Sequence, residues 1–309
     1  MNAQRVIGVD VGGTKILAGL VEGSGRVVRR HECPTPIGSE EQLLDGLAAA
    51  VAELLGEDVA ALGFGIPSTI DQRTGRAVFS ANIPLADLDL RGWMGERFGL
   101  PVAVDNDANA ATIAEWTAGA GRGVSDMVML TLGTGVGGGL ILGGRPFRGW
   151  IGAGAELGHI VIDLDGPPCQ GFCTGRGHLE VLASGLAADA AARAAFGPGS
   201  DAHLLVRLAE EGDARARAVI AEIGRRLGAG IGSLVNIFNP ELVVIGGGFA
   251  AAGDFLLDPA REVVAREALP PARDLVRIVR AELGTEAGVI GAALVGFEAL
   301  DSLGTAERI

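Results

Sequence analysis

Asp10 and the residues after it combine small side chains with charges in a pattern that suits phosphate and magnesium. An apolar run ends at this aspartate, and the turn that follows contains Gly12, Gly13, Thr14 and Lys15. Glycines let backbone N–H groups approach a phosphate without an intervening side chain, and carboxylate oxygen is a preferred ligand of Mg²⁺. Lys15, the only lysine in the chain, would offset phosphate charge. A plain glycine hairpin with a surface lysine explains this single turn equally well.

Two further glycine clusters strengthen the case for a nucleotide. The chain contains Thr131, Gly133, Thr134, Gly135 and Gly138 in one cluster, and Gly246, Gly247 and Gly248 in the other. Gly133, Gly135 and Gly138 match the pattern G-x-G-x-x-G, but a Rossmann motif must open a helix, whereas these glycines lead into an apolar strand at Leu140–Leu142. The glycine spacing of a Walker A loop is also missing before Lys15. We therefore expect a nucleotide held between two lobes by hairpin turns.

The stretch Val104–Asn109 lies where a strand is expected to become a helix. It reads VDNDAN and leads into a helical pattern that continues to Ala118. The helix dipole favours an ionised carboxylate at the N-terminus, so Asp107 should stay ionised and could accept a proton from a hydroxyl that attacks phosphorus. Simple capping of the helix by Asn106 or Asp107 is the alternative.

A short central region gathers side chains that bind metals. Two of the four histidines and two of the three cysteines lie there, namely His159, Cys169, Cys173 and His178. Imidazole and thiolate are the preferred ligands of a closed tetrahedral zinc site. Such a site would be structural, and would fix the loop that presents Glu156, His159 and Glu180 to a polyol. The alternative is a reduced cysteine pair with incidental histidines.

Apolar periodicity predicts the elements that must position these residues. The opening pattern of strand, glycine turn and strand returns in the second part of the chain, where Val6–Gly13 aligns with Met129–Val136. Helical spacing occupies Gln42–Leu55 and Asp213–Phe238, and a last apolar helix is expected over Glu286–Leu300. This order predicts an α/β protein of two related lobes, with ligands in the cleft between them.

Composition limits the partners and the compartment. The net charge of −13 argues against a nucleic-acid partner, which needs clustered Lys and Arg. Three cysteines do not suggest a disulfide framework and favour a reducing compartment. Leu227–Pro240 is too short and glycine-rich to cross a bilayer, and the opening shows no signal-peptide pattern. We expect a soluble cytoplasmic protein, with many of its 50 glycines at turns that approach a ligand.

Taken in order, these motifs resemble those of the ROK family (repressors, open reading frames and kinases) over essentially the whole chain. The first phosphate motif lies at 10–15, the motif of the catalytic aspartate at 106–109 and the second phosphate motif at 131–139. The pattern ExGH at 156–159, the cysteine-rich loop, the adenosine-side segment 240–248 and the closing LGxxAGxxGAA at 283–293 follow. Within the family, the chain is most like the bacterial glucokinases.

The resemblance implies the two-lobed actin-like (ribonuclease H-like) sugar kinase fold, with a duplicated core and an inter-lobe active-site cleft. It implies a small N-terminal α/β lobe at 1–107, completed by a C-terminal helix at 289–309, and a large lobe with the zinc-binding loop at 108–288. The implied reaction transfers a phosphoryl group from ATP to a hexose, with Mg²⁺ and structural Zn²⁺. A homodimer or a dimer of dimers is the implied assembly.

The resemblance also implies roles for individual residues. Asp107 is the general base for the sugar hydroxyl, Asp10 lies near magnesium and the transferring phosphate, and His159 serves zinc and sugar with one ring nitrogen each. The sugar is lined by Gly65, Asn82, Asn106, Asp107, Glu156, His159 and Glu180. The nucleotide is bound by Asp10, Gly12, Gly13, Thr14, Lys15, Thr131, Gly133, Thr134, Gly135, Gly246, Gly247 and Gly248. Zinc is bound by His159, Cys169, Cys173 and His178.

Two features depart from the family pattern. The family has Cys-x-Cys followed by a third cysteine, whereas here the spacing is Cys169-x-x-x-Cys173, and His178 takes the third position. A two-residue insertion accounts for this spacing, and histidine is a competent zinc ligand. The segment Gly65–Asp71 lacks the usual second glycine, which bears on the sugar pocket.

Glucose is the expected substrate, phosphorylated at its 6-hydroxyl. N-acetylmannosamine, N-acetylglucosamine, fructose and allose kinases share the motifs, and polyphosphate is an alternative donor. A sugar-sensing repressor would need a DNA-binding segment ahead of the first strand, which begins within the first ten residues. A sugar-binding module without activity would not need Asp10, Asp107 and both glycine turns. We therefore expect a sugar kinase.

Overall fold

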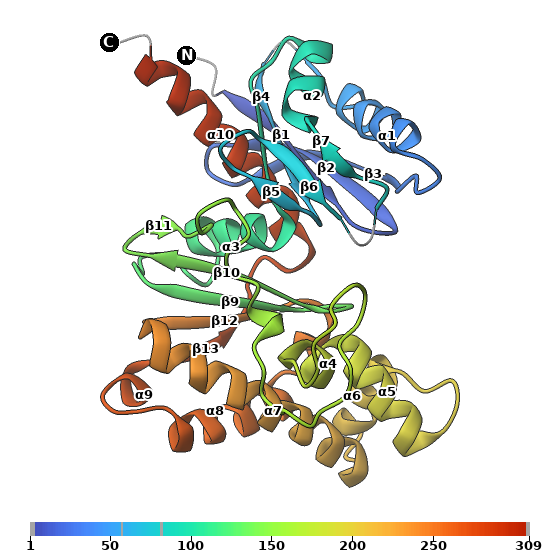
Figure 1. The fold of residues 1–309 in the computed structure, drawn as a ribbon, viewed down its shortest axis with the longest axis vertical. Coiled ribbons are helices and arrows are strands. Elements are labelled where there is room, and N and C mark those ends of the chain that lie inside the picture. The colour runs from blue at the N-terminus through green and yellow to red at the C-terminus, as the bar shows by residue number, and fades with distance from the viewer. Residues whose placement is uncertain (1–3, 57, 81–82, 307–309) are drawn as a thin grey trace. The chain divides into compact units, whose positions relative to one another are not determined.

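The chain folds into two compact α/β units (Figure 1). The computed structural model describes residues 4–56, 58–80 and 83–306, with side chains up to residue 300. Unit 1 consists of Met1–Gly123, Pro146–Gly154 and Thr285–Ile309, and unit 2 consists of Val124–Arg145 and Ala155–Gly284. The chain thus leaves unit 1, returns to it briefly at Pro146–Gly154, and returns again for its last helix.

Unit 1 is built on a five-stranded sheet with the order β3-β2-β1-β4-β8. Its strands are β1 (Arg5–Val11), β2 (Lys15–Glu22), β3 (Val27–Pro34), β4 (Val59–Ile66) and β8 (Val102–Asn106). The first three strands form antiparallel hairpins, whereas β1, β4 and β8 are parallel. The carboxyl ends of the parallel strands therefore share one edge of the sheet, where α/β folds bind their ligands.

Helices cover both faces of this sheet. They are α1 (Glu40–Ala52), α2 (Leu90–Phe98), α3 (Asp107–Ala118) and α10 (Ala287–Ala306). Leu47 of α1 and Met94 of α2 join Ile7 and Val9 in one buried cluster, because alternate side chains of a strand point to the same face. On the other face, Val6 packs in a separate cluster with residues of α10.

Glycines allow α10 to lie close to the sheet. A Cβ atom at Gly8 would overlap the backbone of Val289, and one at Gly63 would overlap that of Ala292. Gly291 stands equally close to the backbone of α3. The expectation that glycines mark ligand-binding turns is therefore wrong for these positions, because they serve the close packing of a helix.

A three-stranded antiparallel sheet completes unit 1. It consists of β5 (Thr69–Asp71), β6 (Arg76–Phe79) and β7 (Ala86–Leu88). The returning segment Pro146–Gly154 packs beside it, since the backbone N–H of Gln72 donates to the carbonyl of Ile151 over 3.2 Å. Gly152, with φ of 96°, leaves no room for a Cβ atom beside the carbonyl of Ile70. The segment is therefore held on unit 1 by its backbone.

Unit 2 repeats the plan of the first sheet. The order is β11-β10-β9-β12-β13, and the strands are β9 (Met127–Leu132), β10 (Val136–Leu142), β11 (Arg145–Pro146), β12 (Leu242–Gly246) and β13 (Arg277–Arg280). β9 and β10 form a hairpin, whereas β9, β12 and β13 are parallel. The predicted duplication of the core is confirmed.

The register of this duplication differs from the alignment made on sequence alone. Asp10 pairs with Gly65 of the neighbouring parallel strand, and Thr131 pairs with Gly246 in the second sheet. Asp10 therefore corresponds to Thr131, whereas the sequence alignment set it against Gly133. That alignment was wrong by two residues because it followed apolar and glycine residues, whereas strand pairing determines the equivalence.

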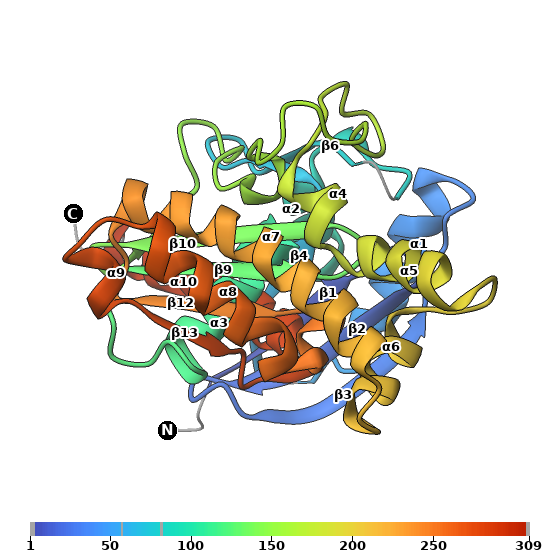
Figure 2. The same ribbon diagram turned by 90° about the horizontal axis from the view of Figure 1, so that it is seen from below.

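The helices of unit 2 form the rest of its core. They are α4 (Leu179–Ala183), α5 (Gly185–Phe196), α6 (Ala202–Glu210), α7 (Ala214–Phe238), α8 (Asp254–Glu267) and α9 (Ala272–Leu275), with the short 3₁₀ helices η1 (Leu157–His159), η2 (Gly248–Ala252) and, at the return to unit 1, η3 (Gly284–Glu286). α7 and α8 lie side by side (Figure 2). Gly224 and Gly228 of α7 leave no room for a Cβ atom beside the carbonyls of α8, so this packing is also close.

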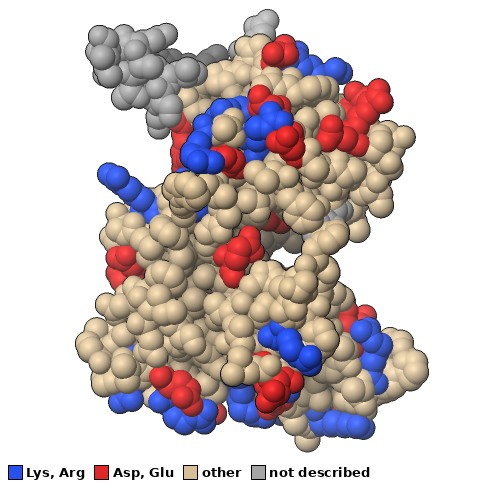
Figure 3. Space-filling view, in the orientation of Figure 1, with Lys and Arg blue, Asp and Glu red and all other residues tan. Residues whose placement is uncertain are grey.

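The compact units and the predicted lobes divide the chain at different residues. The sequence places the first boundary after residue 107, whereas unit 1 extends to Gly123 because α3 packs against α10 and β4. In the described ranges, no helix is long and apolar enough to cross a membrane. On the face shown in Figure 3, the described acidic and basic side chains are interspersed in small groups.

Candidate active site and metal cluster

The candidate functional residues of unit 1 meet at the carboxyl ends of three parallel strands. Asp10 of β1 pairs with Gly65 of β4, which in turn pairs with Asp105 of β8. Asn106 ends the strand, and Asp107 is the first residue of α3. A Cβ atom at Gly65 would lie 3.6 Å from the Cα of Asp107. Gly65, which has no side chain, therefore separates Asp10 at the end of β1 from Asp107 at the start of α3.

Asn106 caps α3. Its Oδ1 accepts hydrogen bonds from the backbone N–H of Ala108 at 2.9 Å and of Asn109 at 3.2 Å, and its Nδ2 donates to the carbonyl of Ser68 at 3.4 Å. Asp107 Oδ1 also accepts from the N–H of Ala108, at 2.9 Å. The cap that the sequence offered as an alternative role for either residue is thus formed chiefly by Asn106.

Asp10 lies in surroundings that favour its protonated form. Burial raises the pKa of this carboxyl, the charge of Asp107 raises it further and that of Lys15 opposes the shift, so that the pKa is about 7. The carboxylate lies against Gly288 in the first turn of α10, where a Cβ atom would overlap it. The influence of Asp107 on this pKa means that the two carboxylates are close enough to interact.

The first glycine turn is held by its own backbone. The N–H of Gly12 donates to the carbonyl of Lys15 at 2.9 Å. Thr35 donates its N–H to the carbonyl of Thr14 at 3.0 Å and its hydroxyl to the carbonyl of Gly12 at 2.7 Å. Lys15 forms an exposed ion pair with Glu32 at 3.0 Å. Because such pairs contribute only about 0–1 kcal/mol, a phosphate can compete for the lysine.

The second and third glycine clusters meet in unit 2. Gly246 at the end of β12 pairs with Thr131 of β9, and Gly247, with φ of 82°, leaves no room for a Cβ atom against the backbone at the end of β9. Gly133 and Gly248, in contrast, have no described heavy atom within 4 Å of the place where a Cβ would lie. The backbone after β9 and after β12, two neighbouring strands, therefore faces open space. Exposed backbone N–H groups of this kind can bind a phosphate group.

Glu180 contacts the second glycine loop. Its Oε2 accepts a hydrogen bond from the N–H of Val136 at 3.0 Å, and a Cβ atom at Gly135 would overlap the same carboxylate. Gln170, which lies between the two clustered cysteines, donates from Nε2 to the carbonyl of Thr134 at 3.4 Å. The predicted sugar-binding and zinc-binding segments therefore hold the loop that is predicted to bind the nucleotide.

Glu156, His159 and Glu180 influence one another. Burial raises the pKa of the Glu156 carboxyl, while the charge of His159 lowers it and that of Glu180 raises it. The 3₁₀ helix η1 brings Glu156 and His159 against β10, since a Cβ atom at Gly158 would overlap the carbonyl of Val136. The three predicted sugar-binding residues of unit 2 thus form one group.

Four potential metal ligands converge beside this group. One ligand atom from each of His159, Cys169, Cys173 and His178 lies within 4.8 Å of the others. The two Nδ1 atoms are 3.2 Å apart, Cys169 Sγ is 3.7 Å from His159 Nδ1, and Cys173 Sγ is 3.5 Å from His178 Nδ1. A tetrahedron with Zn–N of about 2.0–2.1 Å and Zn–S of about 2.3 Å has edges of roughly 3.3–3.8 Å. The ligands therefore fit zinc in type and number, and the three distances given lie close to the edges of such a tetrahedron.

The protonation of this cluster links metal binding to pH. In the metal-free protein, burial is the largest cause that raises the pKa of the Cys169 thiol to about 11, and a hydrogen bond with Cys173 adds to it. A thiol binds zinc as the thiolate, so the metal must displace this proton. Despite the insertion, the loop brings both sulfur atoms to the histidines.

Some contacts of the site were not predicted from the sequence. Asp105, Gln72 and Arg148 form a polar network next to the first turn of α3, and Gly288 lies against Asp10. Tertiary structure makes these contacts, and no local pattern indicates them, although Asp105 adjoins the predicted motif at 106–109 and Gly288 belongs to the closing motif at 283–293. Asn82, which was predicted to bind the sugar, lies outside the described residues.

The duplicated sheet, with carboxylates and glycine turns at its strand ends, defines a two-lobed α/β protein of the actin-like (ribonuclease H-like) class. Residues 6–297 match the model of the ROK family. The chain therefore belongs to the ROK family, as its motifs indicate.

Relatives and solved structures resemble the chain over nearly its whole length. It is 37% identical to a glucokinase of Streptomyces coelicolor over 307 residues, which cover 93% of this chain and 96% of the relative. A ROK family glucokinase from Streptomyces griseus, solved with glucose and AMPPNP, is 36% identical with a TM-score of 0.83, covering 95% of this chain and 99% of that one. A ROK hexokinase from Thermus thermophilus is 37% identical with a TM-score of 0.81, covering 97% and 100%.

Proposed function

We propose that the protein is a glucokinase, which transfers the γ-phosphoryl group of ATP to the 6-hydroxyl of D-glucose. The observation that carries the proposal is the placement of Asp107 at the first position of α3, across Gly65 from Asp10. The likeness to the Streptomyces glucokinases supports the choice of glucose and of ATP.

In the proposed reaction, the oxygen of the 6-hydroxyl attacks the γ-phosphorus, and the bond from this phosphorus to the β,γ-bridging oxygen breaks. Asp107 accepts the hydroxyl proton, and ADP leaves with the bridging oxygen. Ionised Asp10 would hold Mg²⁺ with its carboxylate oxygens, which are ligands that this ion prefers. Mg²⁺, when bound, neutralises charge on the phosphates. The glycine turns supply backbone N–H groups to the nucleotide.

The zinc cluster has a structural role in this proposal. Four protein ligands leave no open coordination position for chemistry. Zinc would fix the loop from which Gln170 and Glu180 hold the second glycine turn. His159 uses Nδ1 within the cluster, so its Nε2 is the nitrogen proposed to contact the sugar. A cytoplasmic location belongs to the same proposal and is supported by the low cysteine count, which favours a reducing compartment. A homodimeric state also belongs to it and rests on the family resemblance.

A panel of sugars and donors tests the proposal. The formation of sugar phosphate is measured with glucose, N-acetylmannosamine, N-acetylglucosamine, fructose and allose, each with ATP and with polyphosphate. We expect kcat/KM for glucose with ATP to exceed that of the other pairs by about tenfold or more. If another sugar gives the highest kcat/KM, that sugar is the substrate and glucose is not. If no pair of sugar and donor is turned over, the protein is not a sugar kinase.

Catalytic efficiency towards MgATP is expected to fall as the pH decreases through about 7. The pKa of Asp10 is raised to about 7, so its carboxyl is ionised above that pH and protonated below it. A protonated carboxyl binds Mg²⁺ poorly, so kcat/KM should fall by up to about tenfold per pH unit on the acid side. The measurement is kcat/KM for MgATP between about pH 5 and 9 at saturating glucose.

Two substitutions determine whether Asp10 is the group that titrates. Lys15→Met removes the charge that lowers the pKa of Asp10. The midpoint of the pH dependence of kcat/KM for MgATP should therefore move to higher pH. Asp107→Asn removes a charge that raises this pKa, so the midpoint of the residual activity should move to lower pH. A wild-type midpoint near about 4, the ordinary range of a carboxyl, would contradict the assignment.

A further inference from the structure

We propose that Arg148 is a positioning residue for Asp107, and that it acts through a buried ion pair with Asp105. The proposal rests on the proposed function, because Asp107 is the proton acceptor of that reaction. Arg148 Nε lies 2.6 Å from Asp105 Oδ2, and the exposed fractions of the two side chains are 20% and 1%. All the residues involved belong to unit 1.

Four hydrogen-bond donors converge on the Asp105 carboxylate. Oδ1 accepts from the backbone N–H of Asn106 at 2.8 Å, from Gln72 Nε2 at 3.2 Å and from Asn109 Nδ2 at 3.2 Å. Oδ2 accepts from Arg148 Nε. A buried carboxylate needs such partners, because an unpaired charge in the interior is strongly destabilising.

These contacts hold the junction between β8 and α3. Asn106 is the N-cap of the helix and Asn109 lies in its first turn, so the Asp105 carboxylate binds both sides of the turn that carries Asp107. That turn also determines how Asp107 faces Asp10. Because a misplacement of about 1 Å can reduce turnover about a hundredfold, the rigidity of this junction matters for proton transfer.

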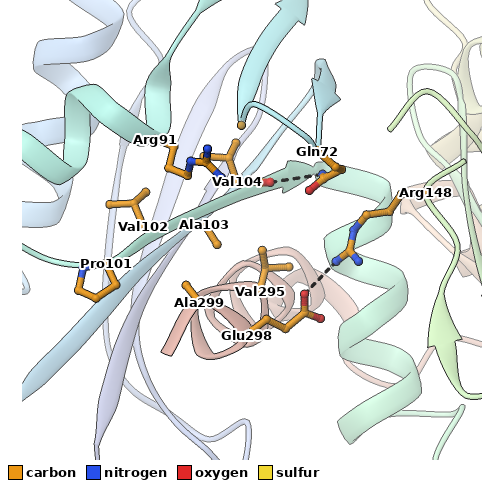
Figure 4. Close-up of a pocket in the computed structure, with 11 residues that line it drawn as sticks. Gln72, Arg91, Pro101, Val102, Ala103, Val104, Arg148, Val295, Glu298 and Ala299 are labelled. Carbon is orange, nitrogen blue, oxygen red and sulfur yellow. Dashed lines mark hydrogen bonds and ion pairs between the residues drawn. The ribbon is translucent and has the colours of Figure 1, made fainter. Parts of the chain in front are cut away.

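Arg148 reaches the junction from a distant part of the chain. It belongs to the returning segment Pro146–Gly154, which is closed into a loop by a hydrogen bond of 3.0 Å from Gly154 N to the Arg148 carbonyl. Arg148 Nη2 also donates to Glu298 of α10 at 3.2 Å (Figure 4). The planar guanidinium thus donates hydrogen bonds to two carboxylates from separate N–H groups. The single ammonium group of lysine reproduces this geometry poorly.

A cavity of about 500 Å³ opens beside the Arg148 side chain (Figure 4). Its lining includes Gln72, Arg91, Val104, Arg148, Val295 and Glu298. Because the Arg148 side chain is itself part of the wall, its truncation would enlarge the cavity towards the Asp105 carboxylate. A small soluble guanidinium ion could then occupy the place of the missing group.

The first experiment is Arg148→Ala with chemical rescue. We expect kcat to fall about a hundredfold, while KM for MgATP changes by less than about threefold. Added methylguanidinium should restore part of the lost kcat, whereas sodium at the same ionic strength should not. Arg148→Lys should be intermediate. Glu298→Gln is the matched control, because it removes the charge of the other partner of Arg148 but leaves the contact with Asp105, and its kcat should stay within about twofold of wild type.

A second variant separates positioning from simple stabilisation. Asp105→Asn combined with Arg148→Met removes both charges, so that no buried charge is left unpaired. If the pair only stabilises the fold, this double variant should regain turnover together with its melting temperature. If Arg148 positions Asp107, kcat should stay low in a protein whose melting temperature has recovered.

The proposal is overturned if Arg148→Ala keeps kcat within about twofold of wild type, or if Glu298→Gln causes an equal loss. Recovery of turnover in the double variant, or no rescue by methylguanidinium, would also overturn it. If the wild-type protein phosphorylates no sugar, the proposed function fails instead. A crystal structure of Arg148→Ala then decides the positioning role, which requires Asp107 to move by about 1 Å or more relative to Asp10.

Discussion

Replacing Asp107 with asparagine is expected to lower kcat about a thousandfold, while the affinity for glucose stays within about threefold of wild type. The amide has nearly the shape of the carboxylate and can still accept the hydrogen bond from Ala108 N, which is 2.9 Å long in the wild-type protein. It cannot accept the proton of the 6-hydroxyl. Turnover is measured by ADP release, and the affinity for glucose by titration calorimetry.

Asp254 provides a matched control for this substitution. It is the first residue of α8, as Asp107 is of α3, and its side chain is 76% exposed. Asp254→Asn should leave kcat unchanged, because this carboxylate contacts Arg261 at the surface of unit 2. A value of kcat for Asp107→Asn within about tenfold of wild type would exclude Asp107 as the general base.

Replacing Cys173 with serine is expected to abolish zinc binding and to destabilise unit 2. Its Sγ lies 3.5 Å from His178 Nδ1 in the four-ligand cluster. If the loss of one zinc ligand lowers the free energy of unfolding by about 3 kcal/mol, the melting temperature should fall by roughly 6–12 °C in a domain of this size. Zinc content is measured by elemental analysis, and unfolding by calorimetry. The nucleotide affinity should fall as well, since the cysteine loop holds the second glycine turn through Gln170.

Cys33 is the matched control for the cluster. It is the third cysteine, lies on β3 of unit 1 and is partly buried, as Cys173 is. Cys33→Ser should keep one zinc ion per chain and a melting temperature near that of wild type. Equal zinc content in Cys33→Ser and Cys173→Ser would contradict a zinc site. So would a wild-type protein that is purified without zinc and binds none when zinc is added.

The features that the sequence predicted well are local. The strand that ends at Asn106 and the helix that starts at Asp107 follow from neighbouring residues, because a capping amide acts within its own turn. The hairpins around both glycine turns likewise join strands that are adjacent in the chain. The convergence of His159 with Cys169, Cys173 and His178 spans a short segment, so that spacing alone indicates it.

The features that the sequence did not reveal depend on distant contacts. Asp105 and Arg148 are 43 residues apart, and neither belongs to a pattern that marks them as partners. Gly288 was part of a recognised motif, but its contact with Asp10 follows from the way α10 packs on β1. For the same reason, the boundary of unit 1 after Gly123 depends on the contact between α3 and α10 rather than on any change in composition.

The position of α10 has a consequence for the order in which the protein folds as it is synthesised. β1 leaves the ribosome before all of unit 2, whereas α10, which packs against β1 and β4, follows about 280 residues later. Until then, Val6, Val21 and Ala61 lack the Ala293 side chain with which they form a buried cluster. Nascent unit 1 thus exposes one apolar sheet face, which a chaperone can bind, while unit 2 can close first.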